Sequence, residues 1–361
     1  MVYVYILLIN LKLKYNKIYM FEHLLTFFIS FLFLLSLNKL FKKFNFNIDK
    51  TSIYEEHKLL LQFNNNVPLS GSFYFLTIVI IIEYFYSLNF IYICLCFFII
   101  GILSDLKVTH SPKLRLLLQS FSLIIFLYFN KDFIIDLRVD YLNSILESEI
   151  FRIIFISFFF LVLINGYNFI DGVNLLSSLN FLIVFYFFLL VAKDINYLQL
   201  EKLIFVLIVC LTIFVIFNFY GKTFLGDGGV YGLACLIGII AVYLSNKSDT
   251  VSPYFIANLF WYPAFENLFS IIRRIISNKK NYLADNLHLH QLLFIYLKKK
   301  NNINKKYLLS SLSGLIINTY LLIFFVIGFQ DYSDTKLQIY LILTNTFFYL
   351  LIYHYLKKFN D

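Results

Sequence analysis

The chain alternates long apolar runs with short polar segments almost from end to end. A helix needs about 20 mostly apolar residues, within a range of about 17 to 25, to cross the hydrocarbon core of a bilayer. Glu83 and Asn89 interrupt one long apolar stretch, so the second and third runs could be divided elsewhere. We predict eleven membrane-spanning helices, at residues 20–37, 73–87, 88–103, 114–129, 150–165, 174–192, 202–219, 229–244, 253–272, 307–328 and 337–356.

Composition agrees with this pattern and excludes a soluble globular protein. Hydrophobic residues make up 60% of the chain and charged residues 14%, whereas soluble domains carry about 25% charged residues. The predicted fold class is an all-α polytopic membrane protein with about 10–11 transmembrane helices. The four cysteines fall within apolar runs, where packing is expected rather than disulfides or metal ligands. Residues 1–19 are interpreted as an N-terminal extension, 20–356 as one integral-membrane domain and 357–361 as a C-terminal tail.

Lysine and arginine are concentrated in alternate loops, whereas the intervening loops are mixed or acidic. Basic loops mark the cytoplasmic side of a membrane protein, so both termini are expected outside. Membrane orientation thus explains the net charge of +9, and the sequence offers no basic, aromatic-rich soluble segment for nucleic acid. The loops predicted to face the cytoplasm are 38–72, 104–113, 166–173, 220–228 and 273–306.

Three aspartates stand in polar junctions between apolar runs. Asp105, Asp171 and Asp227 lie in three of the predicted cytoplasmic loops, separated by even numbers of crossings. They therefore reach one membrane surface whichever way the protein is oriented, as do His288 and His290 in the last basic loop. Carboxylates gathered at one surface repel one another unless a cation neutralises them. Hard oxygen ligands suit Mg²⁺, which keeps waters and shares the phosphate oxygens of a substrate.

Two basic residues follow a predicted helix start. Ser111 is a candidate N-cap, and Pro112 suits the first helical position. Lys113 and Arg115 would then lie at a helix N-terminus, where exposed N–H groups add to their attraction for phosphate. These features predict a phosphate-handling site at the membrane surface. Transfer of a phosphosugar from a cytosolic nucleotide to a lipid phosphate satisfies both the chemistry and the location.

Six segments between roughly residues 47 and 295 resemble the bacterial polyprenyl-phosphate N-acetylhexosamine-1-phosphate transferases, which belong to glycosyltransferase family 4. The pattern is most similar to the branch that initiates O-antigen and surface-polysaccharide synthesis. The segments are VPLSGS (67–72), GILSDLKVTHSPKLRLLLQ (101–119), NGYNFIDGVN (165–174), GKTFLGDGG (221–229), WYPAFENLFSIIRR (261–274) and ADNLHLHQL (284–292).

The resemblance implies ten or eleven transmembrane helices in the bacterial inner membrane, with the active site on the cytoplasmic face. It implies that a UDP-activated N-acetylhexosamine is coupled to undecaprenyl phosphate, with release of UMP and formation of a lipid-linked diphosphosugar. The implied cofactor is Mg²⁺, with Mn²⁺ as the alternative. Membrane lipid and a second copy of the chain, in a homodimer, are the other implied partners.

Site residues follow from the same motifs. Asp227 is similar to the family's Mg²⁺ ligand, while Asn168 and Asp171 fall in its nucleotide and catalytic pocket. Phe224 is similar to the aromatic residue that stacks on uracil. His288 and His290 match a histidine motif that contacts the donor's phosphates.

One position departs from the family. Most members have two adjacent acids where this chain has Ser104 and Asp105, and a serine cannot act as a carboxylate base. The need for a base is small, because a lipid phosphate is already anionic near neutral pH. We therefore expect a single displacement that uses Asp105, Asp171 and Asp227, in which the lipid phosphate attacks the β-phosphorus directly.

Other interpretations stay open at this point. A lipid-linked glycan flippase is one, although transporters place charged features near the bilayer midplane. A catalytically impaired family member is another, because of Ser104. Structural roles compete residue by residue: a helix cap for Asp171, a tight turn for Asp227, and positive-inside anchors for Lys113 and Arg115.

Overall fold

The computed structural model describes residues 24–49, 67–86, 90–109, 111–131, 133, 136–276, 287–300 and 305–360. The extension predicted at 1–19 lies outside the described residues, as do 50–66 and 277–286 of two predicted loops. Within the described ranges nearly every element is a helix. This confirms the all-α fold class.

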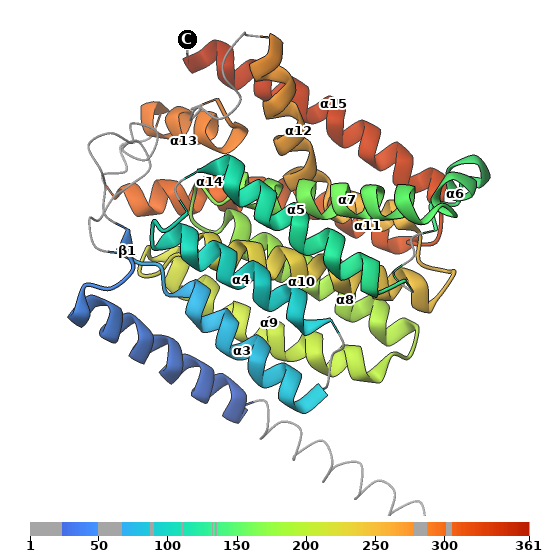
Figure 1. Cartoon of the computed structure of the whole chain (residues 1–361). Helices are drawn as coiled ribbons and strands as arrows, with labels where there is room; N and C mark the ends of the chain where they lie inside the picture. Colours follow the sequence, from blue (N-terminus) through green and yellow to red (C-terminus); the bar gives the residue numbers. More distant parts are fainter. Residues whose placement is uncertain are drawn as a thin grey trace, which may run out of the picture.

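A helix Leu24–Phe44 opens the described part of the chain (Figure 1). A short antiparallel pair follows, in which Ile48 of β1 (Ile48–Asp49) lies opposite Pro68 of β2 (Val67–Pro68). The later helices are α3 (Gly71–Tyr86), α4 (Ile91–Asp105), α5 (Pro112–Phe129), α6 (Asp140–Leu146), α7 (Glu149–Ile170), α8 (Leu176–Asp194), α9 (Leu198–Phe219), α10 (Gly226–Lys247), α11 (Pro253–Leu259), α12 (Trp261–Ile276), α13 (Leu289–Lys300), α14 (Lys306–Gln330) and α15 (Thr335–Asn360).

Eight of the described helices are long and apolar enough to cross a bilayer. They are the first helix and α5, α7, α8, α9, α10, α14 and α15, and each coincides with one predicted span. The shorter apolar helices α3 and α4, of 16 and 15 residues, lie at the predicted second and third spans. The chain is therefore a multi-pass membrane protein.

The prediction of one continuous ninth helix at 253–272 is wrong, because α11 ends and α12 begins on either side of Phe260. Pro263 accounts for the break, since it has no N–H to donate to the carbonyl of Leu259 and its ring crowds that carbonyl. In Figure 1, α12 runs at a steep angle to α10. It directs polar residues into the protein, among them the fully buried Glu266.

Two predicted loops are partly helical. α7 continues to Ile170, so most of the loop predicted at 166–173 is the last turn of a helix. Gly166 lets this turn approach α12 closely, because a Cβ at Gly166 would lie 2.3 Å from the carbonyl oxygen of Pro263. The loop predicted at 273–306 contains the end of α12 and the whole of α13.

Helix α10 forms the centre of the bundle and packs against α3, α4, α7 and α8. Almost all of its residues are buried, and four of its first seven are glycines. Small residues allow helix backbones to approach closely within a membrane. A Cβ at Gly101 of α4 would lie 2.4 Å from the Cα of Gly228 of α10. The C-terminus of α4 is thereby held directly against the N-terminus of α10.

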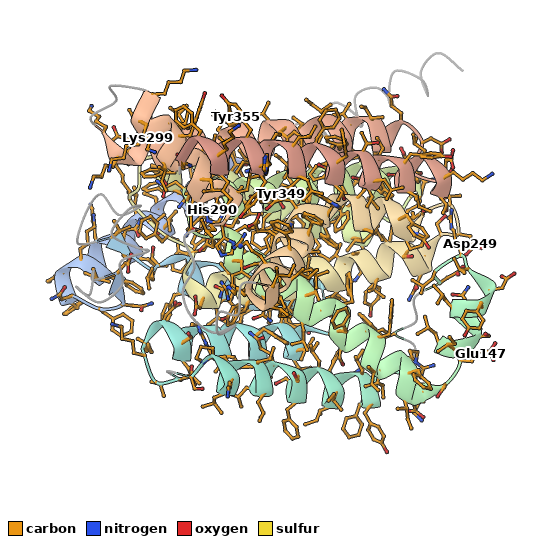
Figure 2. The ribbon with its side chains drawn as sticks, turned by 90° about the horizontal axis from the view of Figure 1, so that it is seen from above. Glu147, Asp249, His290, Lys299, Tyr349 and Tyr355 are labelled. Atoms are coloured by element: carbon orange, nitrogen blue, oxygen red, sulfur yellow. The ribbon has the colours of Figure 1, made fainter. Side chains whose placement is uncertain are left out.

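The bundle has two chemically different ends. Figure 2 shows His290 and Lys299 toward one end and Glu147 and Asp249 toward the other. At the acidic end, Arg138 donates hydrogen bonds to the backbone carbonyls of Ser333 and Asp249, which ties three loops together. The five loops predicted to face the cytoplasm meet at the first end, where Ser72 and Asp227 contact Asp105 and Gly172 packs against His290.

Candidate active site

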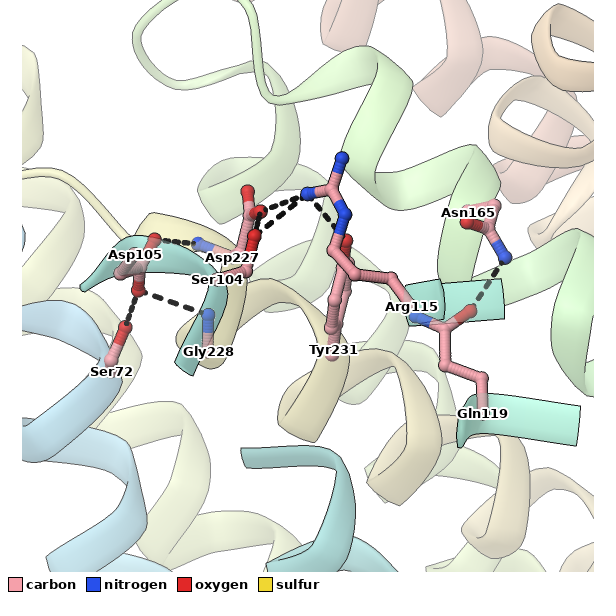
Figure 3. Close-up of polar contacts among 9 residues, drawn as sticks. All are labelled: Ser72, Ser104, Asp105, Arg115, Gln119, Asn165, Asp227, Gly228 and Tyr231. Carbon is pink, nitrogen blue, oxygen red and sulfur yellow. Dashed lines mark hydrogen bonds and ion pairs between the residues drawn. The ribbon is translucent and has the colours of Figure 1, made fainter. Parts of the chain in front are cut away.

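Asp105, the last residue of α4, caps the N-terminus of α10. Its Oδ1 accepts a hydrogen bond from the backbone N–H of Asp227 at 2.7 Å. Its Oδ2 accepts from the N–H of Gly228 at 3.2 Å and from the hydroxyl of Ser72 at 2.8 Å (Figure 3). The first N–H groups of a helix lack partners within the helix, so a carboxylate here satisfies them and opposes the positive end of the helix dipole. Both oxygens of Asp105 are thus engaged with the protein.

Gly226 permits this cap. Its backbone has a φ of +71°, in the left-handed region that favours glycine. A Cβ at Gly226 would also lie 2.6 Å from the Oδ2 atom of Asp105, closer than two nonbonded atoms can approach without displacement. A larger residue here would therefore push Asp105 away from the helix N-terminus.

Asp227, in the first turn of α10, contacts groups from two other helices. Its Oδ2 accepts hydrogen bonds from the hydroxyl of Ser104 at 2.6 Å and from Nη1 of Arg115 at 2.7 Å. The same Nη1 lies 2.7 Å from the Ser104 hydroxyl and 3.5 Å from the hydroxyl of Tyr231 (Figure 3). Within the described ranges, Oδ1 of Asp227 has no hydrogen-bond partner, and the side chain is 27% exposed. One carboxylate oxygen therefore stays open to a ligand.

The segment 67–72 holds the loop that leads into α10. The N–H of Phe224 donates to the carbonyl of Pro68 at 3.1 Å, and the N–H of Gly71 donates to the carbonyl of Phe224 at 3.1 Å. The hydroxyls of Ser70 and Thr223 form a hydrogen bond of 2.6 Å. These contacts give the short VPLSGS motif a physical role, because they fix the backbone immediately before Asp227.

Asp171 lies directly after α7, at the C-cap position. Ser177, in the first turn of α8, donates a hydrogen bond to its Oδ1. Burial raises the pKa of Asp171 to about 8; the bond from Ser177 opposes this rise, and the negative charges of Asp227 and Asp105 add to it. The three carboxylates therefore interact electrostatically.

The other predicted residues are distributed unevenly around these acids. Asn168, in the last turn of α7, and Phe224 are both partly exposed, and the Asn168 amide makes no hydrogen bond with the described residues. Arg115 points to Asp227, whereas Lys113 is exposed in the first turn of α5. Ser111 occupies the predicted N-cap position of α5, but its side chain makes no capping bond.

His288 is held by a buried carboxylate. Its Nδ1 lies 2.9 Å from Oε1 of Glu266, a residue of α12 that is fully buried. The hydroxyl of Tyr349, on α15, donates to the second oxygen of Glu266 at 2.6 Å. The ring of His288 stacks on Phe169 of α7, with ring centroids 5.5 Å apart. The start of α13 is thus fixed by α7, α12 and α15 together.

His290 stacks on His288, with ring centroids 5.5 Å apart, and is almost fully buried. Its two ring nitrogens have no hydrogen-bond partner within the described ranges. A Cβ at Gly172 would lie 2.5 Å from its Nε2, so the ring packs against the turn that carries Asp171. Burial and, to a smaller extent, the neighbouring His288 lower the pKa of His290 to about 3, and the charge of Glu266 opposes this shift. His290 is therefore neutral at physiological pH.

The described side chains offer a sparse oxygen site rather than a closed metal cage. No three His, Cys, Asp or Glu side chains are gathered around one point in the part of the chain that the structure describes. Mg²⁺ is commonly held by one or two carboxylates, with waters and substrate phosphates completing its coordination. The open Oδ1 of Asp227 fits such a site.

Residues 85–245 match the model of Glycosyl transferase family 4. Over this segment, the chain is similar to that family. Two similar proteins are the Phospho-N-acetylmuramoyl-pentapeptide-transferases of Clostridium botulinum strains Eklund 17B and Alaska E43. Each is 31% identical over 163 residues, covering 43% of this chain and 50% of the relative.

The comparison confirms the family resemblance and sets its extent. The chain spans about half the length of the curated relatives it matches. The glycosyl transferase family 4 segment runs from the end of α3 to the end of α10 and contains Asp105, Asp171 and Asp227. The Glu266 and His288 cluster lies beyond it.

Several contacts of the family 4 segment were missed by sequence reasoning. Ser177 binds Asp171, yet nothing distinguishes it from the other serines of the chain, and Ser72, the last residue of the VPLSGS motif, was not expected to bind Asp105. The amide of Asn165 donates to Oε1 of Gln119 at 3.0 Å and joins α7 to α5 (Figure 3). Polar side chains inside apolar helices were the available signal, because such groups need partners in a membrane.

Proposed function

We propose that the chain is a sugar-1-phosphate transferase that moves the phosphosugar of a UDP-sugar to undecaprenyl phosphate and releases UMP. The donor sugar is an N-acetylhexosamine, and the product initiates O-antigen or another surface glycan. The enzyme lies in the bacterial inner membrane, with its site facing the cytoplasm. Mg²⁺ is the required metal.

One observation carries this proposal. Asp227 lies at the start of a buried membrane helix, paired with Arg115 and with one oxygen open, inside the segment that matches a glycosyl transferase family. A carboxylate and a guanidinium side by side suit a ligand that combines a cation with phosphate groups. The end of a membrane helix is where a lipid phosphate and a soluble nucleotide meet.

Each residue of the candidate site has a separate proposed role. Asp227 would hold the metal, whose charge would stabilise the negative charge that develops on the departing UMP, and Asp171 would belong to the same catalytic pocket. Asp105 acts through Asp227 by fixing the N-terminus of α10. Arg115 supplies N–H donors for a phosphate, while Asn168 and Phe224 are exposed enough to contact the nucleotide.

The reaction then needs no protein base. An oxygen of the lipid phosphate, already anionic, forms a bond to the β-phosphorus of the donor. The bond from that phosphorus to the bridging oxygen breaks, and UMP leaves with the electron pair. Ser104 cannot accept a proton as a carboxylate would, but its hydroxyl donates to Asp227 and holds that carboxylate in place.

The test is UMP release from purified protein supplied with undecaprenyl phosphate and UDP-N-acetylhexosamines. We expect release with Mg²⁺, loss of activity to background with a chelator, and recovery when Mg²⁺ or Mn²⁺ is added back. A flippase or an inactive relative would release no UMP under any of these conditions. Activity that persists after full chelation would contradict the metal assignment.

Ser104 offers a second prediction. Replacing Ser104 with aspartate places another carboxylate next to Asp227, and the affinity of an oxygen site for a divalent cation rises with its number of charged ligands. The Mg²⁺ concentration for half-maximal UMP release should fall by roughly tenfold. Ser144→Asp, which adds the same charge at the opposite end of the bundle, serves as the control. An unchanged Mg²⁺ requirement in the Ser104 variant would place the metal away from this serine.

A further inference from the structure

Glu266 is a buried carboxylate that the reaction does not use directly. It is 0% exposed and sits on α12, between α15 and the start of α13. Its Oε1 faces Nδ1 of His288 at 2.9 Å and the N–H of Leu289 at 3.4 Å, and its Oε2 accepts from the hydroxyl of Tyr349 at 2.6 Å. Burying a charge is unfavourable unless hydrogen-bond donors compensate it. Here the donors come from helices far apart in the sequence, so the carboxylate fixes their relative positions.

A second contact fixes the same segment. Nη1 of Arg273, two turns further along α12, donates to the carbonyl of Leu287 at 2.8 Å and to the hydroxyl of Tyr353 at 3.2 Å. Tyr353 lies one turn beyond Tyr349 on α15. The backbone on both sides of His288 is therefore held by α12 and α15.

His288 and His290 connect Glu266 to the turn that carries Asp171. With the Nδ1 of His288 directed at Glu266, its Nε2 is the nitrogen left for a ligand, and Nε2 makes no hydrogen bond with the described residues. His290 stacks on His288 and packs against Gly172, next to Asp171. A continuous set of contacts thus runs from α15 through Glu266 to the turn that carries Asp171.

We propose that Glu266, supported by Tyr349, is a positioning residue that orients His288 toward the diphosphate of the nucleotide donor. This inference rests on the proposed function. It specifies that Glu266, through His288, contributes to recognition of the donor's diphosphate. Glu266 touches neither substrate nor metal. It acts through His288, so its loss weakens donor binding and leaves acceptor binding intact.

The test compares Glu266→Gln and Tyr349→Phe with the wild type. Using UDP-N-acetylglucosamine as the probe, we expect Glu266→Gln to raise the donor KM roughly tenfold, and Tyr349→Phe about threefold. The KM for undecaprenyl phosphate should stay within about twofold. Tyr320→Phe is the matched control, because its hydroxyl bonds Asn345 of the same helix α15 without touching Glu266. A donor KM unchanged in Glu266→Gln, or equal changes in both KM values, would overturn the inference.

A double-mutant cycle separates positioning from general stability. If Glu266 acts through His288, Glu266→Gln combined with His288→Gln will be no worse than His288→Gln alone. If the two substitutions raise the donor KM by independent factors that multiply in the double variant, Glu266 does not act through His288. If Glu266→Gln does not fold, the cycle is run with Tyr349→Phe in its place.

Binding distinguishes this inference from the proposed function. The Kd of UDP for the purified protein needs no turnover, and Glu266→Gln should raise it about tenfold. If the wild type binds UDP but releases no UMP from any donor, the proposed function fails while the binding comparison still decides the role of Glu266. A wild type that binds no UDP overturns both.

Discussion

Replacing Asp227 with asparagine should lower UMP release roughly 10³-fold while the protein stays folded. An amide oxygen can still accept the bonds from Ser104 and Arg115, so the local packing survives. The lost charge removes the proposed hard anionic ligand of the metal. Losses of about 10²–10³ are typical when one stabilising contact to a developing charge is deleted. Initial rates at saturating donor and acceptor, with thermal unfolding in detergent alongside, measure both effects.

Asp249→Asn is the control for that variant, because it removes the same charge from a loop at the opposite end of the bundle. It should leave the rate within about twofold. An Asp227→Asn protein that retains wild-type activity would remove this residue from the metal site, and the proposed mechanism with it. Partial recovery at high Mg²⁺ would instead support a weakened metal site.

The helices were predictable from sequence because a membrane imposes one simple requirement on every span. Lengths of apolar sequence identified the eight long helices and the two shorter ones, with ends a few residues out. The prediction of the ninth span was wrong because hydropathy does not register the effect of proline on a helix. Pro263 breaks the helix although the sequence is apolar on both sides. The last turn of α7 was missed because Gly166 and Asn168 are typical of loops. In the folded protein, the close approach of α12 requires a residue without a side chain at Gly166.

The gathering of the site could be inferred from sequence, but its internal contacts could not. Even numbers of crossings place Asp105, Asp171 and Asp227 at one end of any such bundle, whatever its packing. Which oxygen binds which donor depends on side-chain geometry that no spacing encodes. Asp105 illustrates this, because the sequence suggests a catalytic acid and the structure shows a carboxylate with both oxygens occupied by α10 and Ser72. Glu266 is similar: its motif was visible, whereas its partner Tyr349 lies 83 residues away.

The effect of a substitution at Asp105 on activity should therefore depend on whether the new side chain can accept hydrogen bonds from the N-terminus of α10, rather than on its charge. Asparagine keeps an oxygen that can accept a hydrogen bond from the N-terminus of α10, whereas alanine has none. Alanine also leaves the N–H groups of Asp227 and Gly228 without their acceptor, at about 1–3 kcal/mol for a buried donor. We expect Asp105→Ala to lower the midpoint of thermal unfolding by several degrees and UMP release by roughly 10²-fold or more, since Asp227 loses its fixed position.

Asparagine separates the two possible roles of Asp105. Its single carbonyl oxygen can accept from one of the two N–H groups, so Asp105→Asn should keep part of the cap and lose only about tenfold in rate. A residue that acted through its charge, as a base or a metal ligand, would be disabled equally by asparagine and alanine. Equal losses of UMP release in the two variants, with unchanged unfolding temperatures, would thus show that Asp105 takes part directly in the reaction. A graded loss that follows the unfolding temperature would establish that this acid serves the reaction by holding the N-terminus of α10, and with it Asp227, in place.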